Sequence, residues 1–170
     1  MALEPETLQQ LIDSVRRFVE ERLIPLEAQV SAEDRIPDEV VQEMRDLGLF
    51  GLTIPDSFGG LGLNNEEECH IVMELGRTSP AFRSVVGTNL GIGSQGLLMD
   101  GTKEQQRHFL PRLATGEIIG SFALTEPEAG SDAASLQTKA VRDGDDFLLS
   151  GTKRWISNAK SAQLFTVFAR

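Results

Sequence analysis

The sequence predicts an α+β fold in which an all-helical domain over residues 1–117 precedes the beginning of an antiparallel β-barrel or β-sandwich domain over residues 118–170. Three observations predict it. Apolar residues recur with helical spacing through the first part of the chain. After Ile118 the period changes to that of extended strands. The sequence then ends within an apolar strand pattern at Arg170, so we expect the sheet to be incomplete and the chain to be a fragment.

The first two helices are predicted from spacing and from their end signals. Helical spacing near the amino terminus links Leu8, Leu11, Ile12, Val15, Phe18, Val19 and Leu23. Pro25 is expected to kink or end this helix near Leu23, because proline lacks a backbone N–H. A second helix should begin at Pro37 and Asp38, and Gly48 is a natural carboxy-terminal cap.

The helices that follow are predicted in the same way. Asn65 is expected to cap a third helix, which carries Cys69 in its apolar pattern and ends at Gly76. An apolar helix is predicted between residues 81 and 99. Thr102 should then cap a charged helix that Pro111 interrupts.

Extended segments fill the rest of the chain. Residues 121–125 and 136–142 have strand character, residues 143–146 read as a turn, and residues 147–150 as the returning strand. Residues 164–169 form a further apolar strand pattern.

Composition excludes several classes of function. Sixteen Lys and Arg against 26 Asp and Glu give a net charge of −10, which disfavours nucleic acids and anionic membrane surfaces as partners. No apolar run approaches membrane-spanning length, and no secretory leader pattern is present, so we expect a cytoplasmic protein or one of an organelle matrix.

Cys69 is predicted to be a buried, inert thiol. His70 and His108 have no ligands at metal-binding spacing and are expected to face solvent, so no metal site is predicted.

The most informative residues lie in two stretches. Residues 122–132 read Phe-Ala-Leu-Thr-Glu-Pro-Glu-Ala-Gly-Ser-Asp, and residues 151–158 read Gly-Thr-Lys-Arg-Trp-Ile-Ser-Asn. A loop rich in glycine and hydroxyl groups offers hydrogen bonds with little side-chain bulk, which suits the edge of a polar, planar ligand. Trp155, the only tryptophan, can cover the face of such a ring.

These two stretches resemble the flavin-binding segments of the acyl-CoA dehydrogenase family, and the resemblance extends over nearly the whole chain. Phe122 stands where many members have Tyr, and Ser157 where many have Thr. The resemblance implies FAD as cofactor. It assigns flavin contacts to Phe122, Leu124, Thr125, Gly130, Ser131, Trp155, Ile156 and Ser157. Ser131 would also bond the pantetheine side of a CoA thioester, whereas Glu126 would be structural and not a catalytic acid.

The resemblance also suggests where an acyl chain would lie. The family's acyl channel corresponds to residues 88–98, so the candidate substrate contacts are Ser131, Arg83, Ser84, Thr88 and Leu90. An Arg near position 83 pairs with the distal carboxylate in members that act on dicarboxyl-CoA esters. Residues 91–96 read Gly-Ile-Gly-Ser-Gln-Gly, but their flanks are helical, so we interpret them as glycines that permit close helix packing or leave room for a ligand's tail, and not as a dinucleotide-binding loop.

For the whole enzyme, the resemblance implies α,β-dehydrogenation of an acyl-CoA thioester. A glutamate base removes the α-proton, the β-hydrogen leaves as hydride to the flavin, and an electron-transfer flavoprotein accepts the electrons. That base is expected beyond residue 170, so no catalytic residue is assigned, and the fragment is expected to be inactive and to bind FAD weakly or not at all. A homotetramer or homodimer is expected for the full-length protein. The alternatives are an acyl-CoA oxidase or flavin monooxygenase on the same fold, and a non-catalytic module that binds acyl-CoA or protein.

Overall fold

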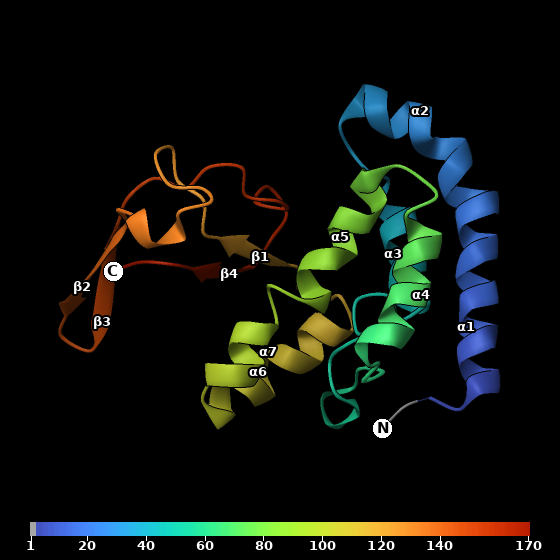
Figure 1. Ribbon diagram of the computed structural model, residues 1–170, viewed down its shortest axis with the longest axis horizontal. Coiled ribbons are helices and arrows are strands. Elements are labelled where there is room, and N and C mark those ends of the chain that lie inside the picture. Colours follow the sequence, from blue (N-terminus) through green and yellow to red (C-terminus); the bar gives the residue numbers. More distant parts are fainter. Residues whose placement is uncertain (1–2) are drawn as a thin grey trace.

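Helices occupy the chain up to Ala114 and strands follow from Gly120, as the sequence predicts (Figure 1). The computed structural model describes residues 3–170. The α-helices are α1 (Pro5–Phe18), α2 (Ile24–Glu33), α3 (Asp38–Asp46), α4 (Asn65–Leu75), α5 (Pro80–Leu90), α6 (Gln95–Asp100) and α7 (Lys103–Ala114). The strands are β1 (Gly120–Ala123), β2 (Lys139–Asp143), β3 (Asp146–Ser150) and β4 (Leu164–Val167).

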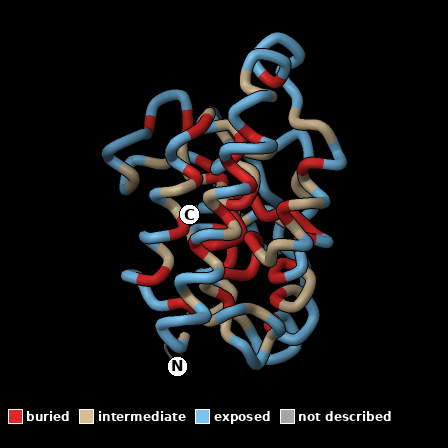
Figure 2. The backbone as a smooth tube through the Cα atoms, turned by 90° about the vertical axis from the view of Figure 1, so that its right-hand side faces the viewer, coloured by how far each residue is buried: buried red, intermediate tan, exposed pale blue. Residues whose placement is uncertain are grey.

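The main hydrophobic core lies among the helices, where the buried residues cluster on the sides that face one another (Figure 2). Its largest fully buried side chains include Phe50 and Phe82. A second cluster joins α7 to the loop after α3 through Ile54, Leu110 and Leu113. Helix α5 lies between the helical part and strand β1, so it is the element against which the sheet segments are placed (Figure 1).

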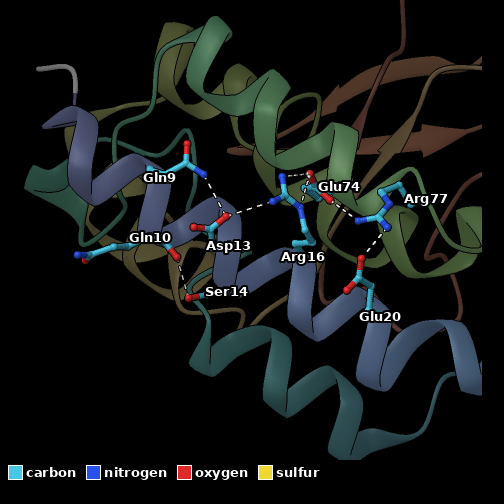
Figure 3. A network of polar contacts seen from close by, with 8 residues as sticks. All are labelled: Gln9, Gln10, Asp13, Ser14, Arg16, Glu20, Glu74 and Arg77. Atoms are coloured by element: carbon cyan, nitrogen blue, oxygen red, sulfur yellow. Dashed lines mark hydrogen bonds and ion pairs between the residues drawn. The ribbon is translucent and has the colours of Figure 1, made fainter.

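Salt bridges tie α1 to α4 on the outer side of the helical part (Figure 3). Glu74 accepts from Arg16 at 2.8 Å and from Arg77 at 2.8 Å, and Arg77 also pairs with Glu20 at 2.7 Å. Hydrogen bonds from Arg16 and then from Arg77 hold the pKa of Glu74 below its ordinary value. The network therefore adds charge pairing to a helix contact that apolar packing already makes.

The predicted helix ends are largely confirmed. Thr102 caps α7 in a capping box with Gln105. Gly48 has φ +70° and donates to the carbonyl of Arg45, while Leu49 donates to that of Met44, which together form a Schellman cap. The cap of α4 is displaced by one residue from the prediction, because Asn64 and not Asn65 accepts from the backbone of Glu66 and Glu67.

The irregularity predicted near Leu23 is present, because a π-helical turn over Val19–Leu23 separates α1 from α2 and Pro25 lies in the first turn of α2, where its missing N–H is tolerated. The prediction that Pro111 interrupts its helix is wrong, since α7 runs on to Ala114. Pro111 lies in the last turn of α7, where the buried neighbours Leu110 and Leu113 hold the helix in place.

The prediction of a buried thiol is also wrong, because Cys69 is exposed. Helix α4 buries Glu67, Ile71 and Leu75, which recur every four residues, and this places Cys69 on its outer side. His70 and His108 are exposed, as predicted.

The sheet segments differ from the prediction in one pairing. Strands β2 and β3 form the predicted antiparallel hairpin, but β1 pairs with β4 in parallel, with Phe122 opposite Thr166. Parallel pairing requires a long crossover, and residues 124–163 provide one. The start of the predicted sheet domain is therefore present, with one parallel pair, β1 with β4, beside the antiparallel hairpin.

Candidate cofactor site

The two motif stretches lie side by side. The Ser121 hydroxyl donates to the carbonyl of Ser157 at 2.6 Å, and the backbone N–H of Arg154 donates to the carbonyl of Thr125 at 2.8 Å. The Lys153 ammonium donates to the carbonyl of Leu124 at 2.9 Å. Residues about thirty positions apart are thus joined at three points, and together they form the candidate cofactor site.

Trp155 has an unusual conformation within this site. Its side chain is 77% exposed, and its backbone φ is +59°, in the left-handed region. Such a φ is rare for a bulky residue and costs about 1–3 kcal/mol. The Arg154 guanidinium lies 4.4 Å from the centroid of the Trp155 ring. An exposed aromatic plane held in a strained backbone is the arrangement expected where a ligand covers it.

Glu126 is a buried carboxylate at the start of the turn that leads to Gly130. Its Oε1 accepts from the Lys153 ammonium at 2.8 Å and from the backbone N–H of Thr138 at 2.9 Å, as well as from the Thr138 hydroxyl. Its Oε2 accepts from the N–H of Gln137. These bonds, that from Lys153 foremost, lower the pKa of Glu126 from 4.5 to about 2. A carboxylate fixed in its charged form is suited to holding the loop and not to donating a proton.

The turn after Glu126 leaves space above the backbone. Glu126 and Ala129 close it with a bridge, in which the N–H of Glu126 donates to the carbonyl of Ala129 at 2.9 Å. Gly130 and Ser131 follow and are exposed. A Cβ at Gly130 would meet no atom within 4 Å, so a ligand can approach this backbone closely.

Phe122, Leu124, Thr125 and Ile156 are half-buried around the same site. The Phe122 ring lies 4.9 Å from that of Phe168 at an interplanar angle of 59°. Because this contact lies across the β1–β4 pair, Phe122 has a packing partner within the chain and only part of its side chain is accessible.

The candidate substrate residues on α5 are divided between surface and core. Arg83 is exposed and Ser84 is half-buried, whereas Thr88 and Leu90 are buried. Ser84 and Ser157 both line a groove between α5 and the segment after Trp155, with Val30, Val85 and Ile119 as apolar neighbours. The structure thus brings Ser84, but not Leu90, to a surface shared with the cofactor site.

Asn158, for which the sequence predicts no role, lies at the junction of the site with α5. Its Nδ2 donates to Thr88 Oγ1 at 2.8 Å and to the carbonyl of Ser84 at 2.9 Å, and its φ is +62°. The one available signal was the residue type, because asparagine adopts the left-handed region at little cost.

The glycines at 91–96 are not a dinucleotide-binding loop. They follow helix α5, whereas that loop requires a preceding strand. A Cβ at Gly93 would lie 2.5 Å from the carbonyl oxygen of Thr88, so this glycine permits close packing, as the sequence predicted.

The described part of the chain offers neither a metal site nor a membrane span. Within residues 3–170, no three His, Cys, Asp or Glu side chains gather where they could hold a metal ion. None of the helices in the same range has both the length and the apolar character needed to cross a membrane.

The fold and site define a class of protein: an amino-terminal helical part followed by sheet segments that present an exposed aromatic plane beside the turn that contains Gly130. The family model "Acyl-CoA dehydrogenase, N-terminal domain" matches residues 5–117, and "Acyl-CoA dehydrogenase, middle domain" matches residues 121–170. The chain therefore belongs to the acyl-CoA dehydrogenase family.

Individual relatives agree with this assignment. The human mitochondrial very long-chain specific acyl-CoA dehydrogenase is 40% identical over 98% of this chain and 26% of its own length. The (2S)-methylsuccinyl-CoA dehydrogenase of Cereibacter sphaeroides is 39% identical over 97% of this chain and 30% of its own length. The structure of an acyl-CoA dehydrogenase from Bacillus anthracis in complex with FAD superposes with a TM-score of 0.87 and 30% identity, over 99% of this chain and 30% of that one. The chain thus spans less than a third of each of these relatives.

Proposed function

We propose that this chain forms the amino-terminal part of an FAD-dependent acyl-CoA dehydrogenase, which converts an acyl-CoA thioester to the trans-2-enoyl-CoA. The observation that carries the proposal is the exposed, left-handed Trp155 held against Thr125 through the backbone of Arg154. Family membership and the FAD named in the Bacillus anthracis structure support it. We further propose that residues 1–117 and 118–170 belong to separate domains.

The residues of the site fit an isoalloxazine ring. Trp155 offers a flat apolar surface to the face of the ring, and Thr125 and Ser157 offer hydroxyl groups to its polar edge. Phe122, Leu124 and Ile156 supply half-buried apolar contacts, and the open backbone at Gly130 leaves room for the cofactor. When bound, FAD supplies the redox chemistry, while this chain supplies binding and orientation.

On the substrate side, Ser131 and Ser84 are the accessible candidates for the pantetheine and acyl portions of the thioester, with Arg83 on the adjacent surface. Thr88 and Leu90 would contact an acyl chain only if the packing around α5 opened. The relatives at 40% and 39% identity act on different acyl groups, so the proposal extends to acyl-CoA thioesters as a class.

The remaining parts of the reaction are assigned to polypeptide outside these residues. We propose that a glutamate base beyond residue 170 removes the α-proton, that an electron-transfer flavoprotein accepts the electrons, and that the full-length protein is a homotetramer or homodimer. The 170-residue polypeptide alone should then be inactive. Formation of enoyl-CoA by this polypeptide would contradict that part of the proposal.

The test is an absorbance spectrum of the full-length protein before and after anaerobic addition of a panel of acyl-CoA thioesters. A flavin band that bleaches with one thioester supports the proposal and identifies the acyl group. Rapid reoxidation by O₂ after bleaching would indicate an oxidase or monooxygenase instead. A colourless protein that cannot be reconstituted with FAD would overturn the proposal in favour of a non-catalytic binding module.

A further inference from the structure

Asn158 joins the loop that carries Trp155 to helix α5. Its Nδ2 lies 2.8 Å from Thr88 Oγ1, 2.9 Å from the carbonyl oxygen of Ser84 and 3.4 Å from that of Val85. A side-chain amide has two N–H groups, and the two short contacts use both of them. These bonds connect residues 70 and 74 positions apart, so they are tertiary contacts and not part of a local turn.

The backbone of the same loop is held at both ends. Trp155 and Asn158 have φ of +59° and +62°, and they enclose Ile156 and Ser157. Asparagine enters this region readily, whereas tryptophan does so at a cost, so the conformation at Trp155 must be maintained by its surroundings. The Ser121 hydroxyl holds the Ser157 carbonyl from the β1 side, and Asn158 holds the loop from the α5 side.

We propose that Asn158 is a positioning residue, which fixes the Trp155–Ser157 segment in its ligand-facing conformation and couples that segment to α5. This inference rests on the proposed flavin-binding role of the segment. Ser84 and Thr88, to which Asn158 donates, are also candidate acyl contacts. The Asn158 amide therefore connects the acyl side of the site with the flavin side. Through its hydrogen bonds, a displacement of α5 would also displace Ser157.

The proposal can be tested without cofactor, because Trp155 is the only tryptophan and its fluorescence reports on the loop directly. Asn158→Gly keeps the left-handed backbone and removes the donor, Asn158→Asp keeps the backbone and replaces the donor with acceptors, and Asn158→Ala loses both features. We expect the amplitude of fast anisotropy decay of Trp155 to increase about twofold in all three variants, because the loop gains nanosecond motion.

Two controls separate positioning from general stability. Lys160→Met removes a charge from the same loop at a side chain that is 93% exposed, and it should leave the anisotropy decay unchanged. Asn89→Ala removes a buried amide that also contacts the start of the sheet, and it should lower the melting temperature without mobilising Trp155 in the folded protein. A wild-type anisotropy decay in both Asn158→Gly and Asn158→Asp would overturn the proposal.

A second measurement addresses the flavin. FAD is titrated into the full-length apoprotein and followed by flavin fluorescence, and we expect the dissociation constant to rise about 10-fold in Asn158→Gly, as for the loss of one to two hydrogen bonds. Equal affinity of wild type and Asn158→Gly would contradict the positioning role. If full-length wild type and every full-length variant fail to bind FAD, the flavin assignment loses support, while the anisotropy measurement still decides whether Asn158 holds the loop.

Discussion

The ammonium group of Lys153 lies 2.8 Å from a carboxylate oxygen of Glu126, and the two side chains are only 13% and 5% exposed. The same ammonium group donates to the carbonyl of Leu124 at 2.9 Å. The pair therefore joins the segment that follows β1, which leads into the turn containing Gly130, to residues 151–154, which lead to Trp155. Removal of one partner from a buried ion pair leaves the other charge uncompensated, which is more damaging than removal of both.

Lys153→Met should loosen the candidate cofactor site while leaving helices α1 to α7 folded. We expect amide hydrogen exchange at residues 124–126 and 151–155 to accelerate about 10-fold or more, because the loops open locally. The double variant Glu126→Gln with Lys153→Met should be less affected than Lys153→Met alone. Arg112→Met, which breaks an exposed ion pair with Glu117, is the matched control and should have little effect. Equal exchange rates in Lys153→Met and Arg112→Met would refute the buried-pair argument.

Glu126 should make the stability of the loop depend on acid pH. The pKa of Glu126 is lowered from its ordinary value of 4.5 to about 2 in the folded chain, so the unfolded state binds the proton more readily. The stabilisation is fully present above pH 4.5 and is lost as the pH falls toward 2. Urea unfolding monitored at Trp155 should show wild type and Glu126→Gln converging over this range. Glu43 and Glu74 also have lowered pKa values, but both residues are present in wild type and in the variant. Their contributions to the pH dependence therefore cancel from the comparison.

The helix caps show how far local sequence information reaches. Gly48 and Thr102 could be predicted because their capping bonds involve neighbours within a few residues. For α4, both Asn64 and Asn65 precede a glutamate by three positions, so the local pattern allows either cap. In the structure Glu67, the capping-box partner of Asn64, is buried and also accepts from the backbone N–H of Leu3, which is a tertiary contact.

The candidate site shows the same limit. Its residue types predicted that the two motif stretches form one site and that Glu126 is structural, because these predictions depend on chemistry and order along the chain. The left-handed backbone of Trp155, the parallel pairing of β1 with β4 and the bonds of Asn158 to α5 arise between segments tens of residues apart. No local pattern encodes contacts of that kind.

Asn89→Ala should destabilise the junction between α5, α7 and β1. The buried Asn89 amide donates to the carbonyls of Leu113 at 3.0 Å and Ile118 at 2.9 Å, and its oxygen accepts from the N–H of Gly120 at 2.7 Å. Alanine leaves these groups buried without partners, which we expect to lower the free energy of unfolding by about 2–4 kcal/mol. Urea denaturation measures the loss. Asn65→Ala, at an exposed position, is the control, and a loss below about 0.5 kcal/mol at Asn89 would be inconsistent with the proposed junction.

Trp155→Asn should stabilise the unliganded chain. Asparagine adopts the left-handed region at little cost, and relief of the tryptophan's strain is worth about 1–2 kcal/mol. Loss of the stacked Arg154 guanidinium offsets about 0.5 kcal/mol of that gain. We therefore expect a net increase of about 1 kcal/mol in the free energy of unfolding, measured by urea denaturation followed by circular dichroism. Phe147→Asn changes another exposed aromatic, which lies in a regular strand, and should give no such increase.

The same substitution should weaken FAD binding, because the flat apolar surface proposed to cover the flavin is removed. Aromatic stacking worth about 1.4 kcal/mol corresponds to a dissociation constant about 10-fold higher, measurable by flavin fluorescence in the full-length protein. A gain in stability together with a loss of affinity is the signature of a strained residue retained for its ligand. If Trp155→Asn gains stability and binds FAD normally, the strain at Trp155 serves something other than the flavin. If it loses stability, the indole stabilises the fold, and its exposed left-handed conformation is no indicator of a ligand.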